Sequence, residues 1–253
     1  MAKTVDRSLD ILFALSETES SIPVGQLASI VDIPISTLYR MLQLLEQRGL
    51  VRRCGGGSFG LGPAMIELGR AARHQMAYDL TSVSVPVMKM LSQQTGETII
   101  LTVPSAFGAV CVEVVDSPKP IRLSFEKGRV LPYHAGASAV MLLAYQNKDV
   151  IQHVLDAGEK NTYANGSIFN KDEFLQVLEE SRQRGYIITR GEVDPGAVGI
   201  SAPIFADSNQ VVAALTVAGP ADRFGQDRIP GLIENLIRST QQIQDDLIGS
   251  VPA

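Results

Sequence analysis

The chain has 253 residues, of which 45% are hydrophobic and 19% are charged, and its formal net charge is −5. This length fits one large or two small domains with a sizeable core, and the composition excludes collagen-like and low-complexity proteins. Two cysteines give no disulfide framework, and the N-terminus lacks the apolar segment of a secretory signal, so we expect a cytoplasmic protein. The apolar runs, such as 211–218, are far shorter than the roughly 20 residues that span a bilayer, and we expect no membrane contact.

The acidic charge is concentrated in the C-terminal part of the chain. Residues 1–77 hold eight Lys/Arg against seven Asp/Glu, a net charge of +1, whereas the remainder holds fourteen against twenty, a net charge of −6. Residues 34–53 contain four arginines and one acidic residue, a local net charge of +3. The total of −5 argues against a nucleic-acid partner, but the N-terminal part by itself does not.

The N-terminal part predicts three short helices and then a hairpin. Apolar residues at helical spacing indicate the helices, which are separated by breaks at 20–23 and Pro34, and Gly49 ends the last one. Two strand-like runs then flank the glycine-rich tip 54–57. The predicted helices cover about residues 4–17, 24–30 and 35–48, and the predicted strands cover 50–53 and 58–61.

The C-terminal part predicts an α+β domain with a largely antiparallel sheet. A helical pattern that begins at Gly62-Pro63 and runs to about residue 77 connects it to the N-terminal part. The sequence Asp207-Ser208-Asn209 indicates a hairpin turn between the last two strands. The predicted helices cover about residues 79–94, 136–146, 149–157, 171–184 and 229–247, and the predicted strands 97–103, 109–115, 121–126, 200–205 and 211–218.

The third predicted helix separates an apolar stripe from a polar face. At about 100° per residue Leu38, Met41, Leu42 and Leu45 fall on one side, and hydroxyls, amides and a guanidinium fall on the other. Such polar groups contact phosphates and base edges in a major groove. An amphipathic surface helix beside an ordinary hairpin explains each feature singly, but their order predicts a winged helix-turn-helix. The polar face and its flanks comprise Ser36, Thr37, Tyr39, Arg40, Gln43 and Gln47, and the wing carries Arg52 and Arg53.

Two motifs suggest other functions, but the residues around each motif do not fit the function it suggests. Residues 55–60 match G-x-G-x-x-G, but the acid nearest to the required position about 20 residues on is Asp79, inside a helical pattern, and Arg52 and Arg53 do not suit a buried parallel strand. Residues 136–140 approach the nucleophile elbow G-x-S-x-G, but Val140 replaces the second glycine. We interpret this stretch as the start of a helix that lines a cavity or packs closely.

No catalytic or metal-binding pattern is evident elsewhere. The three histidines and two cysteines have no metal-ligand spacing, and Cys111 alternates with valines as a core residue does. We therefore expect no metal, no cofactor and no enzyme activity. An alternative is a small-molecule-processing enzyme in the C-terminal domain that uses His134 or Ser138, with the N-terminal part as a regulatory module. A second alternative is a DNA-binding protein whose C-terminal domain only dimerises.

Nine short stretches, modest singly, form a specific pattern in their order and spacing. They are residues 5–12, 33–40, 45–51, 61–63, 95–98, 131–135, 184–186, 201–205 and 217–220. With them the chain resembles the IclR family of bacterial transcriptional regulators over essentially its whole length. The resemblance implies a winged helix-turn-helix at 1–62, a linker helix at 63–78 and a GAF-like effector-binding and oligomerisation domain at 79–253.

The resemblance also implies function. Homodimers or homotetramers would bind double-stranded operator DNA as repressors or activators, commonly of catabolic operons, and would respond to a small metabolite. DNA would be contacted by Ser36, Thr37, Tyr39 and Arg40, which agrees with the polar face that also holds Gln43, and the wing arginines would lie on the DNA backbone.

The family's effector pocket lies between the sheet and the helix that follows the His-Ala motif. Here it maps onto Leu123 on its predicted strand, Gly136, Ala137, Ser138, Thr189, Glu192, Gly199, Ser201 and Thr216. The family often has an acidic residue at Thr189, a cysteine at Gly199 and a serine at Ala218, and a glycine-lysine pair where Ala139-Val140 stands. Fewer polar groups predict a ligand with apolar area, such as an aromatic acid. Ser138, Ser201 and Thr216 could hold its carboxylate.

Overall fold

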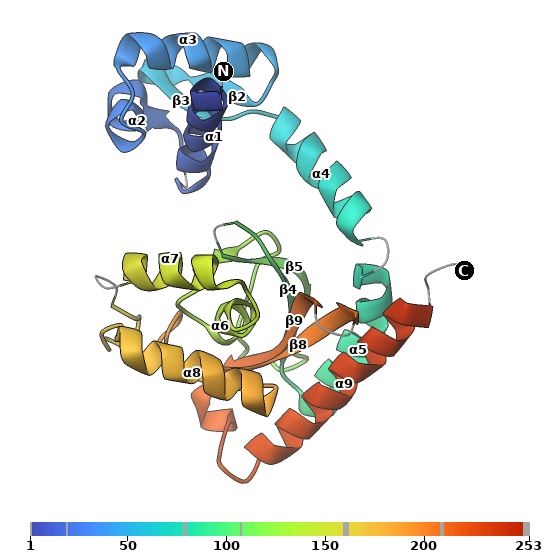
Figure 1. The fold of residues 1–253 in the computed structure, drawn as a ribbon. Coiled ribbons are helices and arrows are strands. Elements are labelled where there is room, and N and C mark those ends of the chain that lie inside the picture. Colours follow the sequence, from blue (N-terminus) through green and yellow to red (C-terminus); the bar gives the residue numbers. More distant parts are fainter. Residues whose placement is uncertain are drawn as a thin grey trace. The chain divides into compact units, whose positions relative to one another are not determined.

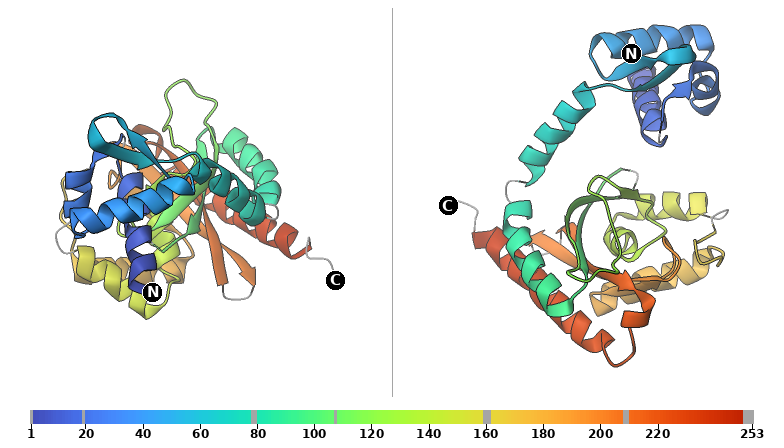
Figure 2. Two further views of the ribbon diagram at one scale, coloured as in Figure 1. Left: turned by 90° about the horizontal axis from the view of Figure 1, so that it is seen from above. Right: turned by 180° about the vertical axis from the view of Figure 1, so that it is seen from behind.

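The computed structural model of the chain describes residues 2–18, 20–77, 80–106, 108–158, 162–207 and 210–249. Two compact units divide the chain, residues 1–76 and residues 77–253. Three views of the ribbon show the elements of each unit (Figures 1 and 2). Within the described ranges, no helix is both long and apolar enough to cross a lipid bilayer.

The first unit packs three helices, α1 to α3 in Figure 1, on a small antiparallel sheet. In this sheet β3 lies between β1 and β2. Its elements are α1 (Ala2–Ser16), β1 (Ile22–Pro23), α2 (Val24–Ile30), α3 (Ile35–Gln47), β2 (Val51–Cys54), β3 (Ser58–Leu61) and α4 (Ala64–Ala77). The helix-turn-helix and the hairpin wing predicted from the sequence are confirmed. The sequence did not predict β1, because two residues are too few to show a strand period.

The core of the first unit forms where the apolar stripe of α3 meets the other elements. Leu38, Met41, Leu42 and Leu45 are all buried, as the helical spacing predicts. They belong to one cluster with Ile11 of α1, Leu27 of α2 and Phe59 of β3, and other members of the same elements. This packing fixes which side of α3 faces outward.

A close backbone crossing holds the end of α3 beside the start of α4. Gly62 donates its N–H to Leu50 O at 2.8 Å, and Ala64 donates its N–H to Gly49 O at 3.0 Å. A Cβ atom at Gly62 would lie 2.1 Å from Gly49 O, so only glycine fits there. Gly49 itself has φ +70°, the left-handed conformation that commonly ends a helix.

The second unit contains an antiparallel sheet in the order β6-β5-β4-β9-β8-β7. Its strands are β4 (Thr98–Pro104), β5 (Ala109–Val115), β6 (Val130–Leu131), β7 (Ile187–Arg190), β8 (Ala197–Asp207) and β9 (Gln210–Pro220). Its helices are α5 (Leu80–Thr95), α6 (Ala137–Leu143), α7 (Lys148–Gly158), α8 (Lys171–Arg184) and α9 (Ile229–Gly249), with a short 3-10 turn at Ala221–Arg223.

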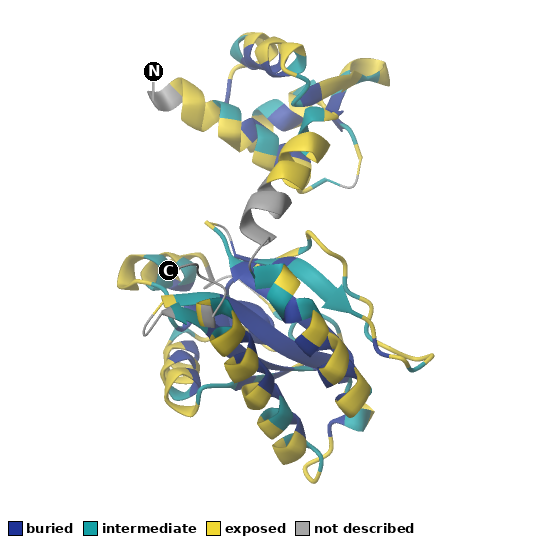
Figure 3. Ribbon diagram, turned by 90° about the vertical axis from the view of Figure 1, so that its right-hand side faces the viewer, coloured by how far each residue is buried: buried dark blue, intermediate teal, exposed yellow. Residues whose placement is uncertain are grey.

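Helices cover both faces of this sheet. The period-two alternation of β4 sends Ile99, Leu101 and Val103 toward α5 and α9, which lie side by side on one face (Figures 1 and 3). Ile100 belongs to the opposite face, the side on which α6 packs. Every residue of α6 is buried, which suits its Ala-, Leu- and Val-rich sequence. The predicted α+β class with an antiparallel sheet is therefore confirmed.

The predicted strand at 121–126 is wrong, and with it the placement of Leu123 on a strand. Residues 121–126 form no regular element. The carbonyls of Ile121 and Leu123 accept hydrogen bonds from the side chains of Arg223 and Thr98 instead of from a neighbouring strand. Pro118 and Pro120, which cannot donate to a strand ladder, precede the segment.

Other differences are smaller. The helix predicted at 136–146 is shorter, because α6 ends at Leu143. The short strand β6 and the edge strand β7 were not predicted. Ser208 and Asn209 of the predicted hairpin turn, and Asp79 at the predicted helix start, lie outside the described residues.

Candidate functional site

The first candidate site is the outward side of α3, here called the outer face of α3. Ser36, Tyr39, Arg40 and Gln43 are exposed and Thr37 is half-buried, so all five residues predicted on this helix lie away from the core. The helix begins directly after Pro34, whose carbonyl accepts the N–H groups of Thr37 and Leu38, each at 2.9 Å. The face therefore presents hydroxyl, amide and guanidinium groups on a helix whose rotation is fixed by its buried side.

Two features of this face were not evident from the sequence. The Tyr39 ring meets the Phe59 ring edge-on, with centroids 6.2 Å apart, so its aromatic body is packed against the wing. Leu44, one turn beyond Arg40, is 62% exposed and was not among the predicted contact residues. Its i,i+4 spacing from Arg40 was the signal that places it on the outer face.

The wing arginines differ in their surroundings. Arg52 Nε donates to Leu61 O at 3.2 Å, which holds its guanidinium beside the hairpin. The Arg53 guanidinium lies 5.2 Å from the centroid of the Phe59 ring and 3.6 Å from a Glu46 carboxylate oxygen. Both residues are exposed, so either can reach a phosphate, but Arg53 must first leave a weak surface ion pair.

The second candidate site is a hollow in the second unit, with about 460 Å³ of empty space that includes its open mouth. Its floor is one face of the sheet. Thr189, Gly199 and Ala218 lie side by side on β7, β8 and β9, and Thr216 lies beside Ile100 on β4. The small side chains at 199 and 218 leave the space open, because a Cβ atom at Gly199 would already lie 3.1 Å from Ala137 Cβ.

The start of α6 and the turn at 191–194 form the opposite side of the hollow. Gly136 has φ +87°, and a Cβ atom there would lie 2.9 Å from Val193 Cγ2, so glycine lets the two segments meet. The Gly136 N–H donates to Glu192 Oε2 at 2.9 Å. Ala137 and Ser138, which follow in α6, also line the hollow.

The side wall comes from the irregular segment that follows β5. Leu123 and Phe125 line the hollow. Arg129 lies over the Phe125 ring at 4.7 Å from its centroid and 3.6 Å from a carboxylate oxygen of Asp194. These contacts link the side wall to the turn at 191–194, which borders the same space.

The hollow brings together eight of the nine residues predicted for an effector pocket. They are Leu123, Gly136, Ala137, Ser138, Thr189, Glu192, Gly199 and Thr216. Ser201 is fully buried beside them but does not line the hollow, since its hydroxyl accepts from Thr216 Oγ1 at 2.9 Å and donates to Leu215 O at 3.2 Å. Ile100 and Ala218 also line the hollow, and the alternation of side chains along their strands could have predicted them. Phe125 and Val193 line it too, but they lie on irregular backbone, which has no periodic pattern.

The charged side chains that line the described hollow are both acidic, Glu192 and Asp194. Burial raises the pKa of the Glu192 carboxyl, and the hydrogen bond from the Gly136 N–H only partly offsets this. Ser138, Thr189 and Thr216 supply hydroxyls. The hollow can therefore offer hydrogen bonds and apolar area, with little fixed charge when Glu192 is protonated.

The two residues of the enzyme alternative, His134 and Ser138, lie in different surroundings. The His134 ring packs against Tyr163 and Phe169, with centroids 6.2 and 6.1 Å away, and burial lowers its pKa. Ser138 lines the hollow, whereas no histidine does so among the described residues. The described residues also contain no cluster of three or more His, Cys, Asp or Glu side chains that could hold a metal ion.

Comparison with known families accounts for both units. The model for the IclR helix-turn-helix domain matches residues 4–55, and the model for the bacterial transcriptional regulator IclR C-terminal matches residues 74–245, more than half of the chain. The chain belongs to the IclR family of transcriptional regulators. The resemblance stated from the sequence is thus confirmed, and this IclR-family chain is a transcriptional regulator with a DNA-binding domain rather than an enzyme.

Individual relatives agree with this assignment. The chain is 30% identical over 241 residues to the HTH-type transcriptional regulator KipR of Bacillus subtilis, which covers 95% of both chains. An IclR-type chain from Silicibacter sp. TM1040 has the same fold, with a TM-score of 0.84, 24% identity and 98% of both chains covered. An IclR homolog from Microbacterium hydrocarbonoxydans, solved in complex with 4-hydroxybenzoate, matches with a TM-score of 0.72 and 24% identity over 98% of this chain and 100% of its own.

Proposed function

We propose that this IclR-family regulator binds operator DNA through the outer face of α3 and the wing, and that a small molecule in the hollow controls this binding. The observation that carries the proposal is the hollow itself, because a domain that only dimerises has no need of empty space lined by hydroxyls and apolar groups. In this scheme residues 1–62 form the DNA-binding domain, 63–78 the linker helix and 79–253 the effector-binding and oligomerisation domain.

The proposed DNA contacts follow from the chemistry of the exposed groups. Arg40 has the bidentate geometry that guanine favours, and Gln43 has that of adenine. Ser36, Thr37 and Tyr39 supply hydroxyls for phosphates or bases, and Arg52 and Arg53 supply positive charge for the DNA backbone. The local charge of +3 over residues 34–53 supports this assignment, since phosphate contacts dominate affinity for DNA.

The proposed ligand is a small carboxylate or aromatic acid. The apolar part of the hollow suits a ring, and the absence of a side chain at Gly199 leaves room for one. Ser138 and Thr189 can donate hydrogen bonds to a carboxylate, whereas the hydroxyl proton of Thr216 is already donated to Ser201. The two acids would repel it, but Asp194 is paired with Arg129 and burial favours the protonated form of Glu192. The homolog that holds 4-hydroxybenzoate makes this compound a suitable first probe.

We further infer that the protein acts in the cytoplasm as a homodimer or homotetramer. Two copies related by a twofold axis would place two α3 helices in successive major grooves of a palindromic operator. For the ligand to control binding, it must bind the DNA-competent and DNA-incompetent arrangements unequally, which typically supplies about 1–3 kcal/mol of coupling.

The proposal can be tested in two steps. A thermal-shift screen of small carboxylates and monocyclic aromatic acids, beginning with 4-hydroxybenzoate, identifies compounds that raise the melting temperature of the full chain. Genomic fragments that the chain retains then provide an operator for fluorescence anisotropy. We expect a compound that raises the melting temperature to change operator affinity roughly 5- to 150-fold. Unchanged affinity with saturating compound would contradict the proposal.

A further inference from the structure

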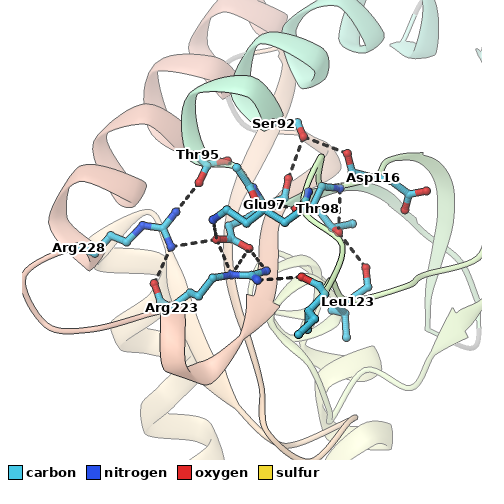
Figure 4. Close-up of polar contacts among 12 residues, drawn as sticks. Ser92, Thr95, Glu97, Thr98, Asp116, Leu123, Arg223 and Arg228 are labelled. Carbon is cyan, nitrogen blue, oxygen red and sulfur yellow. Dashed lines mark hydrogen bonds and ion pairs between the residues drawn. The ribbon is translucent and has the colours of Figure 1, made fainter.

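The Glu97 carboxylate is fully buried and is surrounded by three cationic side chains (Figure 4). Arg223 donates to it through Nε at 3.0 and 3.1 Å and through Nη2 at 2.6 Å. Arg228 donates through Nη1 at 2.9 Å, and Lys119 donates through Nζ at 3.1 Å. Glu97, Lys119, Arg223 and Arg228 are called the clamp below.

The clamp is built around an ionised carboxylate. Burial by itself raises the pKa of Glu97, but the hydrogen bonds from Arg223, Arg228 and Lys119 outweigh it and the pKa is lowered. The surrounding chain leaves no spare room, because a Cβ atom at Gly219 would lie 2.5 Å from Glu97 Oε2. The chain between α5 and β4 supplies Glu97, and segments far along the sequence supply its partners.

One side of the clamp contacts the irregular segment after β5, in which Leu123 and Phe125 form the side wall of the hollow. Lys119 belongs to this segment, and Arg223 Nη1 donates to Ile121 O at 2.8 Å. Leu123, two residues after Ile121, lines the hollow, and its carbonyl accepts a hydrogen bond from Thr98 Oγ1 at 2.8 Å. The segment forms no strand, so these side-chain hydrogen bonds take the place of a ladder in fixing its backbone.

The other side of the clamp is anchored on α5 and at the start of α9. Arg228 lies just before α9 and donates to the Thr95 carbonyl at the end of α5, and through Nη1 to Arg223 O at 2.7 Å. Ser92 Oγ of α5 also bonds the Glu97 carbonyl at 2.9 Å and lies 3.2 Å from Asp116 O, just before the wall segment. The wall is therefore tied to two long helices on the opposite face of the sheet.

We propose that Glu97 is a positioning residue for the hollow: by orienting Arg223 and Lys119 it fixes the backbone of residues 119–123 and so the side of the hollow that Leu123 and Phe125 form. This inference rests on the proposed function only in treating the hollow as the ligand site. It predicts that loss of the clamp loosens this wall locally, before the domain unfolds.

The test uses the ligand-free full chain, so that its outcome is independent of whether the proposed ligand class is right. The sequence contains no tryptophan, and Phe125→Trp therefore gives the wall a single fluorescent reporter. Arg223→Lys in this background keeps the positive charge but replaces the three donor nitrogens that reach Glu97 and Ile121 O by a single ammonium nitrogen. Glu97→Gln is the second clamp variant, and Arg238→Lys, in an exposed Glu234 pair on α9, is the matched control.

Acrylamide quenching of the tryptophan is the readout, together with the melting temperature of each variant. We expect Arg223→Lys to raise the quenching constant about twofold or more at a temperature where the chain remains folded, and Arg238→Lys to leave it unchanged. Glu97→Gln is expected to match or exceed Arg223→Lys if it folds. Unchanged quenching in Arg223→Lys, or an equal rise in Arg238→Lys, would overturn the proposal, since the wall would then be fixed without the clamp.

Discussion

The Glu192 carboxylate accepts a 2.9 Å hydrogen bond from the backbone N–H of Gly136, 56 positions earlier in the chain. This bond joins the turn after β7 to the start of α6, and both segments line the hollow. An acid in this place helps to build the cavity, and its protonation state sets how much negative charge a ligand meets there.

Glu192→Gln is expected to stabilise the protein at neutral pH. The amide oxygen can accept the same Gly136 bond, and no carboxylate has to be buried. Because burial raises the folded-state pKa of Glu192, its contribution to stability is fully present below the unfolded-state pKa and is lost as the pH rises through the folded-state value. We expect the free energy of unfolding, measured in urea, to be about 0.5–1 kcal/mol higher for the variant at pH 7. This difference should disappear toward pH 4. A lower stability of the variant at pH 7 would show that the ionised form is the stabilising one.

Glu97→Gln is expected to show the opposite pH dependence. The clamp lowers the pKa of Glu97, so its contribution is present above the unfolded-state pKa and is lost as the pH falls through the folded-state value. Removing the charge leaves three cations around a buried amide and is expected to cost about 3 kcal/mol or more at pH 7, and less in acid. Glu234→Gln, in an exposed pair, is the control and is expected to cost less than about 1 kcal/mol. Equal costs for the two variants would contradict this account of the clamp.

Arg40→Ala is expected to weaken operator binding roughly 5- to 150-fold, because a bidentate arginine–guanine contact typically contributes about 1–3 kcal/mol. Fluorescence anisotropy on the selected operator measures the effect, and the melting temperature should stay within about 2 °C of wild type. Arg48→Ala is the matched control, because Arg48 is exposed at the C-cap of the same helix and its replacement removes the same charge without the proposed base contact. Wild-type affinity of the Arg40 variant would remove this residue from the interface.

Replacing Arg52 and Arg53 together by alanine is expected to flatten the dependence of log Kd on log salt by about two, since each phosphate contact contributes roughly 0.9. Arg53 lies against Phe59 and Glu46 whereas Arg52 bonds the Leu61 carbonyl, so the single variants distinguish the contributions of the two arginines. The measurement is a series of anisotropy titrations between low and moderate salt. An unchanged slope in the double variant would exclude both side chains from phosphate contact.

The sequence predicted those parts of the fold in which local pattern and tertiary packing agree. The stripe of Leu38, Met41, Leu42 and Leu45 has one period over a whole helix, and all four residues are buried. Of the strands that form the floor of the hollow, β4, β8 and β9 were predicted from their strand-like runs and β7 was not, and the resemblance to the family supplied eight of the lining residues. The buried stripe and the strands have a periodic pattern along the chain, so a short stretch of sequence is enough to detect them.

The remaining features depend on partners far apart in sequence. Residues 121–126 are apolar enough to suggest a strand, but Arg223, about a hundred positions later, takes the Ile121 carbonyl. Glu97 binds Arg223 and Arg228 across 126 and 131 positions, and its motif gave no sign of either partner. The strands β1 and β6 have two residues each, too few for an alternation to repeat.

In the proposed scheme the first unit binds operator DNA, and a ligand in the hollow of the second unit controls this binding. The most direct test of this scheme compares Arg40→Ala with Ser138→Leu, which fills the hollow from α6, by measuring operator affinity and the ligand-induced thermal shift of each. We expect Arg40→Ala to lose operator affinity and keep the thermal shift, and Ser138→Leu to keep operator affinity in the absence of ligand and lose the thermal shift. If Ser138→Leu retained the full thermal shift and the full ligand effect on operator affinity, the hollow would not be the effector site.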